Sequence, residues 1–428
     1  MVGILNRIVN ARRHLFRAAV LIVAASLIPA ATAGAVTTVP AHHHHKAVHA
    51  AHTKKTHTST GAAPLYRGAL LEDADNGNVL FEYNASMVWP PASMAKMMLL
   101  LVAQERINSG RVRATDPVRI SERAAHTGGS RLGLREGQVY PLGELMKAAL
   151  VKSANDAAVA VAEKIGGSVE ATVWMMNSRA RELGMKHTEY HTVDGLPPRP
   201  AHDLDRTTAY DLATVGRALI RETSLLQWSG QQQIEFDGGV CMLHNTNHLV
   251  GHFEGCDGLK TGFTSQAGFN VTATAKRGNM RLIAVILGAP SNPQRFAQAG
   301  KLLTWGFDNF TTVPLLRSGQ TLPVAVQVRS GPSIQPVAPR DLKVVVRKND
   351  VGTVKVVYDM PATIDGPVSA GQPVGRVVVN DRSGMVTEMS VLSPIDFRPA
   401  ALDEPAGADP VEVERAAAAA RNYGNEGN

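Results

Sequence analysis

A serine and a lysine stand three residues apart in an otherwise apolar stretch. The segment "PPASMAKMML", residues 90–99, places Ser93 and Lys96 among alanine, methionine and leucine. Residues at this spacing share one face of a helix, so the hydroxyl and the amine can meet. Burial lowers the pKa of a lysine toward that of a useful base, and a helix N-terminus favours a developing oxyanion. The pair predicts a lysine-activated serine nucleophile, against the alternative that Ser93 caps the helix and Lys96 faces solvent.

A second polar group interrupts two helical stretches in "KSANDAA". Ser153 and Asn155 are two residues apart in this break, so both side chains can face one cleft. Ser153 could relay a proton, and Asn155 could hold a substrate amide and orient Lys96. The alternative is that Asn155 only caps the helix that starts at Asp156.

A third group, "GLKTGFT", precedes a pair of apolar strands and is expected on an edge strand of the sheet. Gly262 lacks a Cβ, so a ligand backbone can approach this edge. Lys260 supplies a positive charge for a substrate carboxylate, and Thr261 lies between them. The alternative is an ordinary edge lysine that discourages aggregation.

The three groups occur together in the order Ser-x-x-Lys, Ser-x-Asn and Lys-Thr-Gly, 60 and then 107 residues apart. That combination is the signature of penicillin-binding proteins and class A β-lactamases. The chain resembles a low-molecular-mass penicillin-binding protein, a serine-type D-alanyl-D-alanine carboxypeptidase of the peptidase S11 family. The resemblance covers about residues 65–395. Further segments that carry it are "GGSRLGLREGQ", "SANDAAVAVAEKIGGS", "MNSRARELGMKHTEY", "TTAYDLA", "DGLKTGFTSQAGFN" and "RLIAVILGA".

The resemblance implies a reaction and roles for the first two motifs. Ser93 becomes the acyl-ester nucleophile and Lys96 its general base, with Ser153 as proton relay and Asn155 as substrate positioner. The substrate is a peptidoglycan stem peptide, from which the last D-alanine is released before water hydrolyses the acyl-enzyme. β-Lactam antibiotics are expected to acylate the same serine, and no metal or organic cofactor is expected.

The resemblance also implies how the third motif binds the substrate. Lys260 would hold the terminal carboxylate, and Thr261 and Gly262 would complete the strand edge. The oxyanion hole would use the N–H groups of Ser93 and Phe263.

Two departures from the family pattern and three rival functions remain. Ala154 replaces the usual glycine, and Asp194 stands where asparagine is commoner, ahead of a longer proline-bearing insert that bears on substrate preference.

A class A β-lactamase would lack the trailing β region and carry a deacylating glutamate. A D-Ala-D-Ala endopeptidase shares the motifs but usually lacks that region. A non-catalytic peptidoglycan-binding scaffold would have a broken motif.

The elements that must position these residues can be read from hydrophobic periodicity. "RGALLEDADNGNVLFEY" predicts a hairpin, and "AGFNVTATAKRGNMRLIAVILGA" predicts two strands joined near Gly278. Between them lie helical segments, "SMAKMMLLLVAQERI", "LGELMKAALV", "AAVAVAEKIGG", "SVEATVWMMNSRARELGM" and "AYDLATVGRALIRE". Strands at both ends with helices between predict an α+β fold, an antiparallel sheet with helices on both sides. The penicillin-binding protein and β-lactamase family shares this architecture.

A small all-β domain is expected to follow the catalytic domain. "LKVVVRKNDVGTVKVVYDM" and "VGRVVVNDRSGMVTEMSVL" each alternate, turn and alternate again. We assign the catalytic domain to residues 64–313 and the β domain to residues 316–396. A polar tail fills residues 397–428, and its composition predicts disorder.

The N-terminal residues read as an export signal and a spacer. Four arginines precede an apolar run and small residues, which is typical of a signal peptide over residues 1–35, cleaved after Ala33 or Ala35. Residues 36–63 form a His-rich linker with seven of the fifteen histidines. We therefore expect an exported protein of the periplasm or cell envelope. Peripheral attachment to the inner membrane is the alternative, and the absence of an aromatic or leucine face in the tail weighs against it.

Charge and cysteine content limit the remaining possibilities. The net charge is +7, and removal of four signal-peptide arginines leaves +3, without a basic stripe of interleaved aromatics, so no nucleic-acid partner is expected. The two cysteines, Cys241 and Cys256, could pair in an oxidising compartment or remain free thiols.

Overall fold

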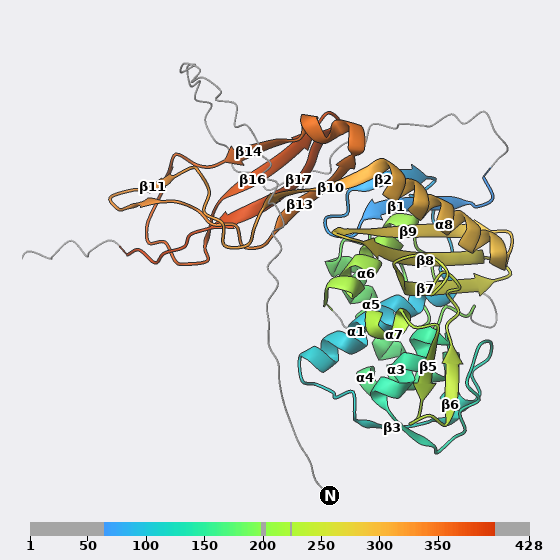
Figure 1. Ribbon diagram of the computed structural model, residues 1–428. Coiled ribbons are helices and arrows are strands. Elements are labelled where there is room, and N and C mark those ends of the chain that lie inside the picture. The colour runs from blue at the N-terminus through green and yellow to red at the C-terminus, as the bar shows by residue number, and fades with distance from the viewer. Residues whose placement is uncertain (1–63, 198–202, 223–224, 399–428) are drawn as a thin grey trace, which may run out of the picture. The chain divides into compact units, whose positions relative to one another are not determined.

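The computed structural model describes residues 64–197, 203–222 and 225–398 (Figure 1). The expected signal peptide and His-rich linker lie outside this part of the chain, as does the tail beyond residue 398. Within it, no helix has both the length and the hydropathy that a membrane span requires.

A five-stranded antiparallel sheet joins residues 68–83 to residues 256–289. Its order is β2-β1-β9-β8-β7, formed by β1 (Gly68–Asp73), β2 (Val79–Tyr83), β7 (Cys256–Thr264), β8 (Gly268–Arg277) and β9 (Met280–Ala289). The predicted hairpin and strand pair are confirmed, and so is the fold class. Strand β7, which carries the Lys-Thr-Gly motif, lies at the edge of the sheet as expected.

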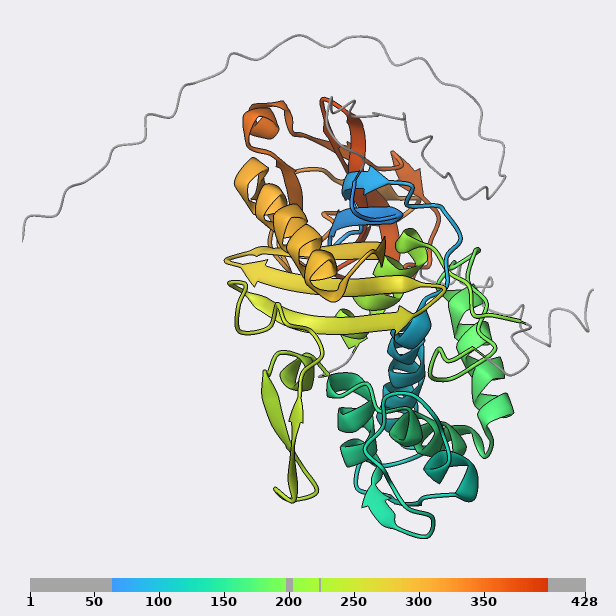
Figure 2. The same ribbon diagram turned by 90° about the vertical axis from the view of Figure 1, so that its right-hand side faces the viewer.

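Both faces of the sheet are buried under helices. Neighbouring side chains of a strand point to opposite faces, so each strand contributes to two hydrophobic clusters. On β1, Leu70 joins one hydrophobic cluster, whereas Ala69 and Leu71 join another. Helix α8 (Asn292–Asn309) packs on the face of Ala69 and Leu71. Figure 2 shows α8 in orange across the strands. Helix α6 (Ala209–Glu222) packs on the other face.

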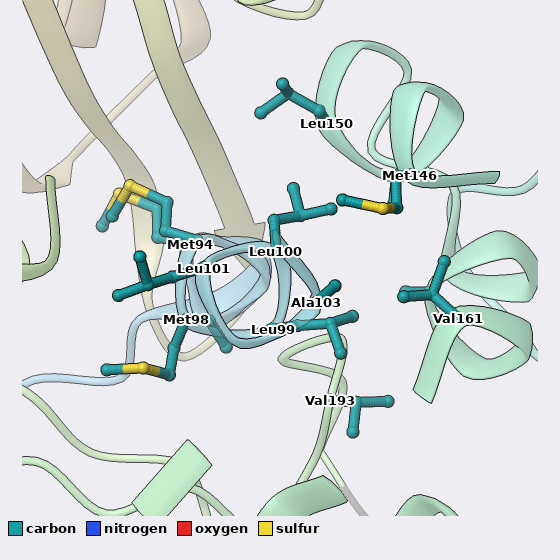
Figure 3. Packing of buried hydrophobic residues seen from close by; sticks show 14 of the residues in the cluster. Met94, Met98, Leu99, Leu100, Leu101, Ala103, Met146, Leu150, Val161 and Val193 are labelled. Atoms are coloured by element: carbon teal, nitrogen blue, oxygen red, sulfur yellow. The ribbon is translucent and has the colours of Figure 1, made fainter. Parts of the chain in front are cut away.

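The remaining helices surround α1 (Lys96–Asn108), which continues from a 3-10 turn, η1 (Ala92–Ala95). They are α3 (Leu142–Val151), α4 (Asn155–Gly166) and α5 (Val169–Glu182). Figure 3 looks along α1, with Met98, Leu99 and Leu100 spreading from it and Met146 and Val161 facing it from neighbouring helices. Residues 97–101 are all fully buried, so the helix that carries the lysine is fixed on every side.

Short elements complete the helical part of the molecule. They are β3 (Pro117–Arg119), α2 (Glu122–Ala125), β4 (Val139–Pro141), α7 (Leu226–Ser229), β5 (Gln233–Phe236) and β6 (Cys241–His244). Strands β3 and β4 pair with each other, as do β5 and β6. Cys241 is exposed and Cys256 is buried, and both are free thiols, which resolves the open alternative against a disulfide.

The C-terminal part is built from strands only, with one 3-10 turn. Strand β10 (Phe310–Leu316) pairs with β13 (Leu342–Arg347). The other sheets are β12-β11-β15 and β14-β16-β17. Their strands are β11 (Val326–Val328), β12 (Ser333–Ile334), β14 (Lys355–Asp359), β15 (Thr363–Ile364), β16 (Pro373–Asp381) and β17 (Gly384–Leu392).

One of the two repeats predicted there has a different connection. β16 and β17 form the expected hairpin through Arg382 and Ser383. The turn expected at residues 349–352 is instead a 3-10 helix, η2 (Lys348–Thr353), and β13 and β14 lie in different sheets. Alternation identified the strands correctly, but it carries no information about which strand each one pairs with.

Candidate active site

The turn that presents Ser93 is held between two glycines. Ser93 lies in η1, after Ala92 at a φ of 51°, a value that costs a non-glycine residue free energy. A Cβ on Gly195 would stand 1.9 Å from the carbonyl oxygen of Ala92, and one on Gly262 would stand 2.5 Å from that of Pro91. Only residues without side chains allow this approach from both directions.

The space beside Gly262 is therefore filled by the chain itself. We expected the missing Cβ to admit a ligand backbone at the strand edge. In the structure the backbone of Pro91 and Met94 occupies that position, with Met94 N 3.2 Å from the Cβ position. The glycine is needed for packing the nucleophile turn against β7.

Lys96 lies completely buried at the start of α1 and contacts three oxygen atoms. Its Nζ is 3.0 Å from Ser93 Oγ, 2.7 Å from Asn155 Oδ1 and 2.7 Å from the carbonyl oxygen of Asp194. Burial lowers the pKa of Lys96 to about 8, while the charges of Asp194, Asp205 and Asp156 oppose the shift. The structure thus excludes the alternative in which Lys96 faces solvent.

The orientation of the Asn155 amide is fixed by its other contact. Asn155 Nδ2 donates to the carbonyl oxygen of Gly128 at 2.7 Å, so Oδ1 must face Lys96. A carbonyl of Asp194 and an amide oxygen can only accept, and each takes one hydrogen of a neutral amine. The lone pair of Lys96 then points at the Ser93 hydroxyl, the one contact that can donate.

The alternative interpretation, in which Asn155 only caps a helix, is wrong. Helix α4 begins at Asn155 itself, and the N-cap residue is Ala154, which makes no side-chain cap hydrogen bond. The Asn155 backbone N–H instead donates to the carbonyl oxygen of Ser130 at 2.7 Å. The side chain and the backbone of Asn155 thus both hold the loop between α2 and β4 against the site.

Ser153 and Lys260 form the second polar pair of the site. Lys260 Nζ donates to Ser153 Oγ at 2.8 Å and to the carbonyl oxygen of Thr261 at 3.0 Å. Ser153 has a φ of 63°, which turns its side chain into the break between α3 and α4. Burial, with the positive charges of Lys96 and Arg295, lowers the pKa of Lys260 well below its ordinary value.

The rest of the third motif is held by residues outside the motif. Thr261 Oγ1 donates to Thr246 Oγ1 at 2.9 Å, and Arg295 on α8 donates to the carbonyl oxygen of Gly262 at 3.0 Å. The Phe263 side chain is 54% exposed and stacks on Phe269, with ring centroids 4.2 Å apart. It offers an apolar surface at the end of the strand.

The structure brings six of the predicted side chains into one cluster, and it adds others that the sequence analysis did not identify. The motif residues are Ser93, Lys96, Ser153, Asn155, Lys260 and Thr261. Those added are Thr246, Arg295 and the Asp194 carbonyl. The Asp194 segment was noticed only as a departure from a family pattern, and no sequence signal marks a backbone acceptor.

Comparisons with known proteins agree with this geometry. Residues 54–291 match the family described as D-alanyl-D-alanine carboxypeptidase, and residues 310–393 match the penicillin-binding protein 5 C-terminal domain. The D-alanyl-D-alanine carboxypeptidase DacF of Bacillus subtilis is 34% identical over 340 residues, which cover 78% of this chain and 86% of that protein.

Solved structures give the same result. Penicillin-binding protein 5 from Haemophilus influenzae is 29% identical with a TM-score of 0.70, covering 79% of this chain and 99% of that one. Penicillin-binding protein D2 from Listeria monocytogenes, solved in an ampicillin-bound form, is 28% identical with a TM-score of 0.54. It covers 58% of this chain and 100% of that one.

Proposed function

The chain belongs to the D-alanyl-D-alanine carboxypeptidase family, and from that premise we propose that Ser93 is its acyl-ester nucleophile and Lys96 its general base. The chain is accordingly a serine-type D-Ala-D-Ala carboxypeptidase, a hydrolase. The observation that carries the residue assignment is the 3.0 Å contact between Lys96 Nζ and Ser93 Oγ, with the two other amine contacts made to pure acceptors.

Acylation begins with proton transfer from Ser93 Oγ to Lys96 Nζ. The oxygen attacks the carbonyl carbon of the penultimate D-alanine in a peptidoglycan stem pentapeptide, and the negative charge moves to the carbonyl oxygen. The N–H groups of Ser93 and Phe263 would receive that charge. When the C–N bond breaks, Ser153 passes a proton to the departing amine and takes one from protonated Lys96, which becomes neutral again as free D-alanine leaves.

Substrate recognition would rest on the edge strand β7. Lys260 supplies the positive charge for the terminal carboxylate, Thr261 and Gly262 form the adjacent edge, and Asn155 binds a carbonyl or amide group of the substrate. Lys260 lies with 1% of its surface exposed, so a carboxylate there would be recognised in a poorly hydrated place. Water then attacks the ester carbon and releases the shortened peptide.

β-Lactams would acylate Ser93 by ring opening, because their amide is a strained analogue of the bond that the enzyme cuts. The ampicillin-bound relative from Listeria monocytogenes supports this extension. Endopeptidase action on cross-linked peptides and β-lactamase turnover are the alternatives. Among the described acidic groups, those whose charges bear on Lys96 are aspartates, which does not favour a glutamate-dependent deacylation.

The substrate indicates where the protein works. Peptidoglycan lies outside the cytoplasmic membrane, so residues 1–35 would direct export to the periplasm or cell envelope, where the enzyme would take part in cell wall biogenesis and cell shape. The expected new N-terminus follows Ala33 or Ala35, and N-terminal sequencing of the exported chain checks it.

A labelled penicillin tests the assignment of the nucleophile directly. The wild-type chain should carry the label on Ser93, and Ser93→Ala should carry none while it keeps the melting temperature of the parent. D-alanine release from a pentapeptide should exceed both dimer cleavage and penicillin turnover. Full D-alanine release by Ser93→Ala would show that the nucleophile lies elsewhere.

A further inference from the structure

A buried carboxylate next to the site has contacts that the proposed mechanism does not use. Asp205 is 6% exposed, and its hydrogen bonds come from one short segment. Oδ1 accepts from the N–H of His191 at 2.6 Å and from that of Thr192 at 3.0 Å, and Oδ2 accepts from Thr192 Oγ1 at 2.7 Å. The carboxylate thus ties together two successive residues of the segment that leads to Asp194.

The hydroxyl of Thr192 connects Asp205 to Gly195. An ionised carboxylate only accepts, so Thr192 must donate its proton to Asp205. Its oxygen then remains free to accept the N–H of Gly195, which lies 2.9 Å away. Gly195 in turn packs against the Ala92 carbonyl, directly before the nucleophile.

The same turn supplies one of the oxygen atoms that orient the lysine. The Asp194 carbonyl accepts from Lys96 Nζ at 2.7 Å, and it belongs to the same peptide unit as the Gly195 N–H that Thr192 holds. Burial lowers the pKa of Lys96, and the charges of Asp194, Asp205 and Asp156 oppose that shift. Asp205 therefore acts on Lys96 in two ways, through the hydrogen bonds that hold the Asp194–Gly195 turn and through its negative charge.

The groups around Asp205 allow it to stay ionised while Lys96 titrates. Burial raises the pKa of Asp205 to about 6, and the charge of Asp194 adds to the shift. The Tyr190 hydroxyl is fully buried beside it, between the fields of Asp205 and Asp211. Because the pKa of Lys96 lies higher, at about 8, Asp205 carries its negative charge throughout that titration.

We propose that Asp205 is a positioning residue for acylation, which acts through Thr192 on the Asp194–Gly195 turn and so holds Lys96 toward Ser93. The inference rests on the proposed function, in which Lys96 is the base. Asp205 does not touch the reacting atoms. Its effect is to fix the acceptor of one amine hydrogen and to raise the pH at which the amine becomes neutral.

The experiment measures the second-order rate of labelling by a fluorescent penicillin from pH 6 to pH 9.5. Asp205→Asn removes a negative charge, so the rising limb should move to lower pH by roughly half a unit, and the plateau should fall at least about 10-fold because the turn is misplaced. Thr192→Val keeps the charge, so its plateau should fall with the limb nearly in place. Thr192→Ser, which keeps the hydroxyl, should restore the plateau.

Asp211→Asn is the matched control. Asp211 is also 6% exposed and accepts from the N–H of His187 and the hydroxyl of Thr188, on the same stretch of chain but without a bond to the Asp194 turn. It should leave limb and plateau unchanged. An Asp205→Asn profile equal to that of the parent, or an equal change in Asp211→Asn, would overturn the inference.

The same measurement separates this inference from the proposed function. If the parent chain takes no label, or if the label is retained in Ser93→Ala, the proposed function fails before any Asp205 variant is compared. If the parent is labelled on Ser93 with a rising limb and the Asp205 and Thr192 variants match it, the inference alone fails.

Discussion

At the scale of single residues, the site depends on which groups can accept but not donate. Lys96 meets two such acceptors, the Asn155 amide oxygen and the Asp194 carbonyl, at 2.7 Å each. A neutral amine has two hydrogens, so its lone pair is left for the Ser93 hydroxyl at 3.0 Å. The base is oriented by its contacts before a substrate arrives, which limits the reorganisation needed in the transition state.

This arrangement predicts a pH dependence for acylation. Because the pKa of Lys96 is lowered to about 8, the labelling rate should rise about tenfold per pH unit below that value and level off above it. Lys96→Arg keeps the charge but cannot lose its proton at these pH values, so it should label at least about 100-fold more slowly. Stopped-flow labelling at several pH values measures both, and a flat profile from pH 6 to pH 9.5 would contradict the role of Lys96 as base.

At the scale of elements, the nucleophile turn is positioned by pieces of backbone that approach it closely. Strand β7 contributes Gly262, and the segment before α6 contributes Gly195, each within a distance that a side chain would not permit. Arg295 fixes the carbonyl of Gly262 from α8, and Asn270 on β8 donates to the Pro90 carbonyl at 3.0 Å. Hydrogen bonding from β8 and close packing from β7 thereby fix the position of η1.

Gly195→Ala tests this close packing. The new Cβ would overlap the Ala92 carbonyl at 1.9 Å, so penicillin labelling should fall at least about 100-fold as Ser93 is displaced. Gly184→Ala is the matched control, since Gly184 has a φ of 75° against 81° for Gly195 but nothing within 4 Å of its Cβ position. It should cost about 1 kcal/mol of stability and leave labelling intact. Equal loss of labelling in both variants would assign the effect to backbone strain alone.

The elements also indicate what can be predicted from this sequence. Helices, hairpins and motif residues follow from local periodicity and from three short motifs, because these depend on neighbours in the chain. The contacts of Asp194 and Arg295 do not, since each joins a backbone carbonyl to a residue far away in sequence. Strand partners are also non-local. For this reason local alternation did not predict that β13 and β14 lie in separate sheets. Helix α8 is a different case, because Ser291 caps it and Pro293 lies in its first turn, a local signal from which the helix could have been predicted.

At the scale of the whole molecule, several carboxyl groups are buried within the catalytic part. Glu72 and Asp73 are neighbours on β1, with 2% and 1% of their surfaces exposed. Arg217 forms two hydrogen bonds of 2.9 Å with Glu72, and Asp73 Oδ1 accepts from the N–H of Asp75 at 3.0 Å. Burial nevertheless raises the pKa of each to about 7, because loss of hydration outweighs these partners.

Raised carboxyl pKa values give this molecule a stability that falls as the pH rises. In the unfolded chain Asp73 would titrate near its ordinary value of 3.8, so between about pH 4 and pH 7 the folded state binds more protons. The stabilisation is complete below that window and is lost through it. Asp73→Asn keeps an acceptor for the Asp75 N–H without a charge, and should reduce the decline in unfolding free energy between pH 4.5 and pH 7.5 by on the order of 3 kcal/mol. Urea unfolding at the two pH values measures this, with Glu388→Gln as control, because that carboxylate lies in an exposed pair with Arg376. If the parent and Asp73→Asn lose the same unfolding free energy over the window, Asp73 is ionised in the folded protein and the origin of the decline must be sought elsewhere.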